Sequence, residues 1–251
     1  MALKFRTAAF SLAIVGLATI ANAQFLGTAA SFAVLGGSTV TNTGPTVLTG
    51  NLGVWPGTAI TGFPPGIVIN GTIYMGTAEA MQAQSDVTTA YNSLAGESFD
   101  GDLTGQDLGG MTLFAGVYNF DTSAFLTGTL TLDAQGDPNA RFVFQMGSSL
   151  ITASNSVVNV INSGVDCNVY WQVGSSATIG TFTAFAGHIL ALTSISLNTG
   201  ATIVEGSALA RNGAVTMDSN VITTCAVVPE PMTMVVLGLG LSALAVRRRR
   251  K

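Results

Sequence analysis

Charged residues are scarce in this chain. Asp, Glu, Lys and Arg make up 9% of its 251 residues, and neither of the two lysines lies within residues 24–226. That stretch contains only two basic side chains, Arg141 and Arg211, but all of the acidic residues except Glu230. A surface with so little positive charge cannot neutralise many phosphates, which excludes nucleic acid and makes anionic membranes poor partners.

Histidine and cysteine are also rare. His188 is the only histidine, and Cys167 and Cys225 are the only cysteines. One histidine and two cysteines cannot easily complete a tetrahedral zinc site. No HExxH, P-loop or Ser-His-Asp spacing accompanies them. We therefore expect no catalysis and no cofactor, and we expect His188 to be an ordinary surface or core residue.

One acidic segment is similar to the first half of a calcium loop. It runs from Asp100 through Asp102 to Gly105. Position twelve of such a loop needs an acidic residue, and Met111 stands there. The pattern favours a solvated turn over a metal site.

The N-terminal segment is typical of a secretory signal peptide. Residues 1–23 begin with Lys4 and Arg6, continue through an apolar stretch, and end in Ala-Asn-Ala, a small-x-small cleavage pattern. The mature chain is predicted to begin near Gln24. An anchor helix is the less favoured alternative, because the apolar run is shorter than the ~20 residues that a membrane span needs.

The C-terminal segment, residues 227–251, combines three elements. Pro229-Glu230-Pro231 precedes an uncharged apolar stretch, and four arginines and a lysine follow. This order resembles the PEP-CTERM sorting signal of Gram-negative bacteria, which implies recognition and cleavage by an exosortase. A simple tail anchor is the alternative. We expect an exported protein of a Gram-negative bacterium, held at the cell surface or released after processing.

An exported chain meets an oxidising compartment, where disulfides form and persist. A bond between Cys167 and Cys225 would close a long loop, worth roughly 4 kcal/mol in the chain-entropy model. Two buried free thiols are the alternative.

The body of the chain, residues 24–226, repeats short patterns. Copies of one pattern occupy residues 43–54, 182–191 and 199–210, and a second pair occupies 142–149 and 169–176. Such self-similarity is typical of a solenoid, in which each unit buries its apolar side by stacking on the next. The units are short β-prone runs broken by glycine and proline, which indicates strands. The predicted fold class is therefore all-β.

Residues 77–95 differ from the rest of the body. They lack glycine and proline, Thr77 is a candidate N-cap, and Gly96 is a stop signal. Met81, Val87, Tyr91 and Leu94 fall on one helical stripe. The pattern predicts one α-helix.

Small hydroxyl-bearing residues recur when the repeats are aligned with Ser149, Ser176, Ser194 and Gly213 as equivalent corners. One column then contains Ser154, Thr181, Thr199 and Asp218, and another contains Ser156, Thr183, Ala201 and Asn220. Residues two apart on a strand share a face, so these columns predict a flat grid. Backbone ladders and β-branching hold such a grid rigid, as recognition of a regular lattice such as ice requires.

Several segments resemble the microbial ice-binding protein family. They are residues 26–44, 82–86, 103–110, 142–145 and 169–173. The resemblance implies an irregular right-handed β-helix with a long helix packed alongside. It also implies that an N-terminal coil lies next to C-terminal coils, which would explain why residues 42–46 resemble residues 198–202. In the family, ice binding is attributed to one flat face.

A loose Thr-Ala/Gly-x-Thr/Asn pattern of the family fits residues 152–155 and 199–202. The expected ice-binding residues are Thr43, Thr46, Thr152, Ser154, Ser156, Thr181, Thr183, Thr199 and Thr202. Phe182, Phe185, Asp218 and Glu205 would disturb this face if they pointed outward.

The predicted function is adsorption to ice by a monomer, which inhibits ice growth or recrystallisation. The alternative is a structural or adhesive component of an extracellular matrix that binds exopolysaccharide or neighbouring copies.

Overall fold

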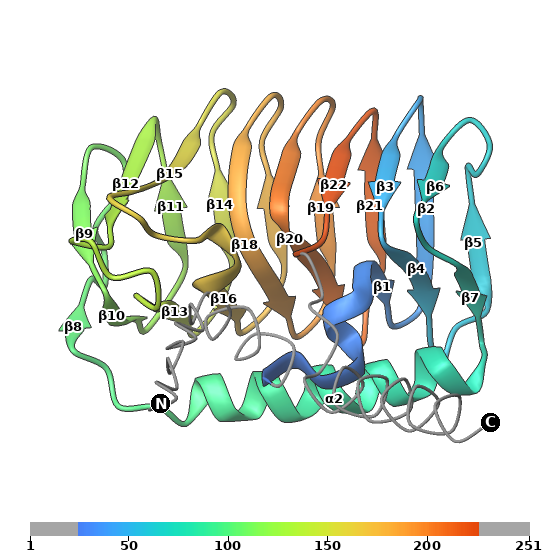
Figure 1. Cartoon of the computed structure of the whole chain (residues 1–251), viewed down its shortest axis with the longest axis horizontal. Coiled ribbons are helices and arrows are strands. Elements are labelled where there is room, and N and C mark those ends of the chain that lie inside the picture. The colour runs from blue at the N-terminus through green and yellow to red at the C-terminus, as the bar shows by residue number, and fades with distance from the viewer. Residues whose placement is uncertain (1–24, 226–251) are drawn as a thin grey trace, which may run out of the picture.

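The computed structural model describes residues 25–225, and most of the strands in it pair in parallel. They form a 15-stranded sheet and a 7-stranded sheet. The chain passes repeatedly from one sheet to the other, so each turn of chain stacks on another around a common interior. Figure 1 shows these turns side by side along the long axis, with one long helix lying beneath them.

The 15-stranded sheet supplies two sides of the body. Two long strands, β18 (Ala184–Ala191) and β20 (Thr202–Ala210), belong to both sides. The first half of β18 pairs with β15, and its second half pairs with β16. The register of β18 against β20 shifts between Ala186 and Gly187, where the chain passes from one side to the other.

We call the side that contacts the long helix the helix side. Besides the second halves of β18 and β20 it contains β1 (Phe32–Gly36), β4 (Asn51–Val54), β7 (Ile73–Met75), β8 (Gly101–Asp102), β10 (Gly116–Phe120), β13 (Phe142–Met146) and β16 (Val169–Val173).

The other side of this sheet is the open side. It contains the first halves of β18 and β20 with β3 (Val47–Thr49), β6 (Ile67–Ile69), β9 (Thr112–Phe114), β12 (Thr129–Asp133), β15 (Val157–Ile161) and β22 (Val221–Thr223).

The 7-stranded sheet is the third side, and we call it the seven-strand sheet. Its strands follow in the order β11 (Ala124–Leu126), β14 (Leu150–Thr152), β17 (Ala177–Ile179), β19 (Ile195–Leu197), β21 (Val215–Asp218), β2 (Thr39–Thr43) and β5 (Ala59–Thr61).

Turns from the two ends of the body lie next to each other. In the seven-strand sheet β2 lies between β5 and β21. On the open side β3 pairs with β22, and on the helix side β1 pairs with β20. Figure 1 shows the corresponding blue and red strands as neighbours. The expected placement of an N-terminal coil beside C-terminal coils is confirmed.

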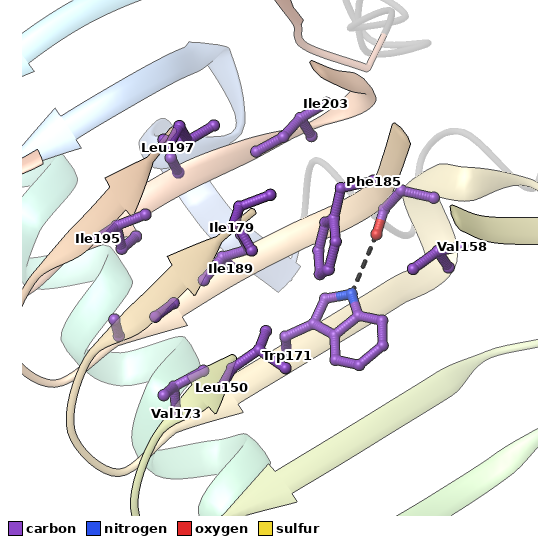
Figure 2. Close-up of a cluster of buried hydrophobic side chains, with 14 of the residues drawn as sticks. Leu150, Val158, Trp171, Val173, Ile179, Phe185, Ile189, Ile195, Leu197 and Ile203 are labelled. Carbon is purple, nitrogen blue, oxygen red and sulfur yellow. Dashed lines mark hydrogen bonds between the residues drawn. The ribbon is translucent and has the colours of Figure 1, made fainter. Parts of the chain in front are cut away.

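The core fills the space between the three sides. Trp171 is fully buried, and its ring stacks on Phe144 with centroids 4.1 Å apart. Its indole N–H donates to the carbonyl of Ala186 at 3.0 Å (Figure 2), so the one polar atom of this ring is satisfied. Leucine, isoleucine and valine from all three sides complete the cluster (Figure 2).

The expected helix is present as α2 (Ala78–Ala95), with Thr77 as its N-cap. Its buried residues recur every three or four positions, as in Ala80, Ala83 and Val87. Met81 is 46% exposed, so its expected place on the buried stripe was wrong. The buried stripe passes through Ala80, and one residue further along a helix points about 100° away.

A short 3-10 helix, η1 (Gly27–Ser31), precedes β1, and a second, η2 (Asp166–Asn168), precedes β16. No helix within residues 25–225 has the length and apolarity that a membrane crossing requires. The signal peptide and the sorting segment predicted for the two ends lie outside the described residues.

Candidate functional site

In most strands of the seven-strand sheet the middle residue points away from the core, and in β5 the outward residue is the last one, Thr61. The neighbours of a middle residue point inward, as in β19, where buried Ile195 and Leu197 flank half-buried Ser196. The outward residues pair across the sheet in one row, which we call the central column. In order, the central column consists of Phe125, Ile151, Thr178, Ser196, Thr216, Thr41 and Thr61.

Five consecutive members of the central column carry a hydroxyl group. Neighbouring strands lie ~4.7 to 4.9 Å apart, so the hydroxyls from Thr178 to Thr61 form a regular row. The Thr216 hydroxyl donates to Ser196 Oγ at 3.0 Å, which orients two of them. At the other end of the row, exposed Phe125 and Ile151 make the surface apolar.

A second row of small residues precedes the strands. Ser123, Ser149, Ser176 and Ser194 occupy successive turns. The hydroxyls of Ser123, Ser176 and Ser194 each accept a hydrogen bond from a backbone amide of the next turn, at 3.2 to 3.3 Å. The next member is Ala214 and not Gly213, because Ile195 pairs with Val215. The sequence alignment of corners was therefore one residue out at this turn.

Five of the predicted ice-binding residues have exposed or half-buried side chains. Thr43 ends β2, and Ser154, Thr181 and Thr199 follow their strands at the same corner between the seven-strand sheet and the open side. Thr202 begins β20 on the open side. The Thr199 hydroxyl donates to Asp218, and the Ser219 hydroxyl donates to the same carboxylate at 3.0 Å. These bonds hold Asp218 at the corner.

The structure corrects the other four predictions. Thr46, Ser156 and Thr183 are 0% exposed and Thr152 is 4% exposed, so none of them can contact an external surface. Their hydroxyls bond inside the corner, where Thr183 donates to the carbonyl of Ala153 at 3.1 Å and Ser156 to that of Leu126 at 2.9 Å. Residues two apart share a face only while the strand continues, and here the chain turns.

The bulky and charged residues that would disturb a flat face if they pointed outward lie in different places. Phe185 points inward, is 2% exposed, and packs against Trp171 with ring centroids 4.9 Å apart. Phe182 is 63% exposed at the corner. Glu205 is exposed on β20, away from the seven-strand sheet. Only Phe182 and Asp218 therefore border the seven-strand sheet.

The predicted ice-binding residues include none of the hydroxyl residues of the central column: Thr41, Thr61, Thr178, Ser196 and Thr216. A usable signal was present, because Ile195-Ser196-Leu197 and Val215-Thr216-Met217 each place one polar residue between two apolar ones. That alternation predicts an outward middle residue on a half-buried strand.

His188 is buried on the outer face of the helix side, where its ring stacks on Tyr170 with centroids 5.4 Å apart. Its Nδ1 lies 2.8 Å from Ser207 Oγ, and its Nε2 lies 3.5 Å from Cys225 Sγ. Burial lowers the pKa of His188 to about 4, so the imidazole is neutral at pH 7. Cys225 is bonded to Cys167 in a disulfide. These contacts make His188 a buried, hydrogen-bonded residue of the fold.

No group of three or more metal-ligating side chains occurs among residues 25–225. In the segment that is similar to a calcium loop, Asp102 Oδ1 accepts hydrogen bonds from the backbone N and the hydroxyl of Thr104, at 2.9 and 2.6 Å. The Thr104 side chain and backbone thereby lower the pKa of Asp102. This carboxylate caps a turn.

Within residues 25–225 the protein is a long parallel-β body with one packed helix and a row of outward hydroxyls, which places it in the class of parallel-β proteins with one helix alongside. Residues 34–223 match the Ice-binding-like family, and the chain belongs to that family.

Particular relatives are similar over most of the chain. The "Ice-binding protein" of Nostoc sp. (strain HG1) is 55% identical, over 98% of this chain and 96% of the relative. The crystal structure of an ice binding protein from an Antarctic Biological Consortium is 46% identical with a TM-score of 0.77, covering 87% of this chain and 96% of that one. The ice-binding protein of the ascomycete Antarctomyces psychrotrophicus is 41% identical with a TM-score of 0.77, covering 80% of this chain and 98% of that one.

Proposed function

We propose that this protein binds ice through the central column of the seven-strand sheet. One observation carries the proposal: hydroxyl-bearing residues follow one another, from Thr178 to Thr61, on adjacent strands of a sheet that no other element of residues 25–225 covers. The relatives that are named ice-binding proteins support it through their similarity in sequence and fold.

Rigidity makes such a row suitable for a crystal surface. The backbone ladder holds the side chains at a regular spacing, and β-branching restrains χ1 of each threonine. A preorganised array loses little conformational entropy on adsorption. The threonine methyls contact the surface without hydrogen bonds that liquid water would offer better. Adsorption of this kind limits crystal growth or recrystallisation and needs no catalysis or cofactor.

The other two sides suit this role less well. Helix α2 covers the helix side. The open side exposes Ile67, Val204 and Val221, where the central column has hydroxyls. Thr43, Ser154, Thr181, Thr199 and Thr202 lie at the border with the open side, and we propose that they extend the contact at its rim.

Changing Thr216 to tyrosine tests the proposal. Thr216 is exposed in the middle of the hydroxyl row, so a phenol there lifts the flat surface away from ice without disturbing the core. We expect thermal hysteresis and inhibition of recrystallisation to fall severalfold. Thr129→Tyr on the open side is the matched control, because Thr129, like Thr216, is an exposed threonine on a strand. Equal activity of T216Y and the unchanged protein would remove the seven-strand sheet from consideration.

We also propose the finer features of the sequence prediction. The stacked turns form an irregular right-handed β-helix, and the mature protein is a monomer of the body at residues 24–226. Residues 1–23 leave as a signal peptide, and residues 227–251 act as a PEP-CTERM signal for an exosortase in a Gram-negative bacterium. The protein then stays at the cell surface or is released. Mass spectrometry of the natural protein tests the two cleavages. A mass that includes residues 1–23 and 227–251 contradicts them.

The matrix alternative rests on the sorting segment, which lies outside the described residues. The relatives support ice as the main partner. We propose exopolysaccharide only as an additional partner of the protein.

A further inference from the structure

A groove crosses the corner between the helix side and the open side. It consists of two adjoining hollows of about 410 and 480 Å³, which share Ser31 and Asn51 in their walls. The first hollow extends past Tyr74 to Glu79 and Gln82 on α2, and the second extends past Asn70 to Glu205 and Thr223. This corner is the one opposite the seven-strand sheet, so a molecule adsorbed through the central column leaves the groove free.

Hydrogen bonds between separate segments preform the floor of the groove. Asn51 Nδ2 donates to Ser31 Oγ at 3.0 Å, and Asn51 Oδ1 accepts from the backbone N of Thr72 at 2.9 Å. Near the helix, Gln82 Nε2 donates to Asp86 Oδ1 at 2.9 Å, and the backbone N of Thr28 donates to Asp86 Oδ2 at 2.7 Å. The groove therefore exists without a ligand.

The first hollow combines an aromatic ring with free polar atoms. The half-buried ring of Tyr74 packs against Phe32 with centroids 5.6 Å apart. Its hydroxyl makes no hydrogen bond to any residue in the described range. Gln82 Oε1 is likewise unpaired within that range, because only Nε2 contacts Asp86. A flat apolar ring beside unpaired hydroxyl and amide groups offers both stacking and hydrogen bonding to one ligand.

Charge selects the class of ligand. Both hollows contain a carboxylate, Glu79 in one and Glu205 in the other, and no lysine, arginine or histidine is among their lining residues. Phosphate, sulfate and uronate groups would be repelled. Carboxylates and amides accept hydrogen bonds from neutral hydroxyls, and charge-assisted bonds of this kind are the stronger ones.

We propose that this groove binds a neutral glycan chain. One sugar stacks its C–H face on Tyr74, and its hydroxyls donate to Gln82 and Glu79. The chain continues across Asn51 toward Asn70 and Glu205. The open, elongated shape suits a polymer, and the site is independent of the central column.

Isothermal titration calorimetry of residues 24–226 at millimolar ligand tests the proposal. The probes are neutral hexasaccharides of glucan, mannan, xylan, galactan and chitin type, with hexagalacturonate as the anionic probe. We expect saturable binding of at least one neutral probe and none of hexagalacturonate. Absence of heat from every neutral probe, or preference for the anionic probe, overturns the proposal.

Variants locate the site. Gln82→Ala removes an exposed side chain and should weaken binding about fivefold to tenfold, which corresponds to the loss of one good hydrogen bond. Asn92→Ala, an exposed amide further along α2, is the matched control and should bind normally. Tyr74→Ala should weaken binding at least about tenfold. Unchanged binding by Q82A and Y74A would place the glycan elsewhere, whereas unchanged ice activity in Q82A separates this site from the ice-binding one.

Discussion

At the scale of single residues, threonine and serine have two opposite roles in this molecule. Thr216 and Thr178 point outward from the middle of strands, where their methyl and hydroxyl groups meet solvent. Thr152 and Thr183 lie 3.2 Å apart, hydroxyl to hydroxyl, inside a corner. A buried hydroxyl needs a partner, and there it satisfies backbone groups that the end of the strand leaves unpaired. A count of threonines therefore says little about the size of an ice-binding surface.

His188 makes the stability of the fold depend on pH. Its pKa is about 4 in the folded protein and 6.5 in an ordinary exposed histidine. As the pH falls from about 6.5 to about 4, His188 becomes protonated in the unfolded chain but stays neutral in the folded protein. The unfolding free energy therefore decreases by up to about 3 kcal/mol. Urea denaturation at pH 7 and pH 4.5 measures the loss.

His188→Gln is the control, because glutamine does not titrate in this range. The difference in unfolding free energy between wild type and H188Q should shrink as the pH falls. Asp166 acts in the opposite direction, since burial and the neighbouring charge of Glu205 raise its pKa to about 6. Asp166 is present in both proteins, so its contribution to the pH dependence of the unfolding free energy cancels in the comparison. A constant difference across the two pH values would contradict the assignment to His188.

At the scale of elements, glycines set how closely the long strands stack. Gly187 has φ +90°, and a Cβ added there would lie 2.3 Å from the carbonyl oxygen of Val169 on β16. It stands where β18 passes from the open side to the helix side. The close approach of β18 to β16 and the change of side therefore both depend on a missing side chain.

Gly187→Ala should lower the unfolding free energy more than Gly128→Ala does. Both glycines have φ +90°, so both variants carry the left-handed strain of about 1 to 2 kcal/mol. Nothing lies within 4 Å of a Cβ at Gly128, so the excess in G187A measures the clash with β16. Chemical denaturation of the two variants gives this excess. Equal losses would mean that β16 moves away at no cost.

At the scale of the whole molecule, the two ends of the body are stacked together. Strands β21 and β22, which come last in the chain, pair with β2 and β3, which come near its start. Folding must therefore bring distant segments into register, and the loop entropy of doing so opposes folding. The disulfide between Cys167 and Cys225 links the end of the last turn to η2, just before β16.

Removing this disulfide should destabilise the fold by up to about 4 kcal/mol in the chain-entropy model, given a sequence separation of 58 residues. We expect the double variant C167S/C225S to melt at a lower temperature in calorimetry. Dithiothreitol should lower the melting temperature of the unchanged protein but have no effect on the variant. Identical melting of the oxidised protein and the variant would show that stacking alone holds the last turn.

Several features followed from local patterns in the chain. The helix at Ala78–Ala95 was predicted because Thr77, Gly96 and an apolar stripe are local signals. Strands were predicted because β-branched runs alternate with glycine and proline. The family resemblance added the contact between the first and last turns, which no local signal contains. The outward row of the seven-strand sheet could also have been found from three-residue alternation.

The stacking of the turns determines which side chains point outward and which are buried. Pairing of Leu150 with Ala177, Ala177 with Ile195, and Ile195 with Val215 spans unequal lengths of chain, because the turns differ in size. An alignment of repeats cannot place such insertions, so it put buried Thr183 on the surface and overlooked Thr178. Propensity and periodicity are properties of neighbouring residues, and they determined the strands, the helix and the supply of hydroxyls. Burial depends on contacts between distant turns, and only those contacts determined which hydroxyls face outward and that Cys167 meets Cys225.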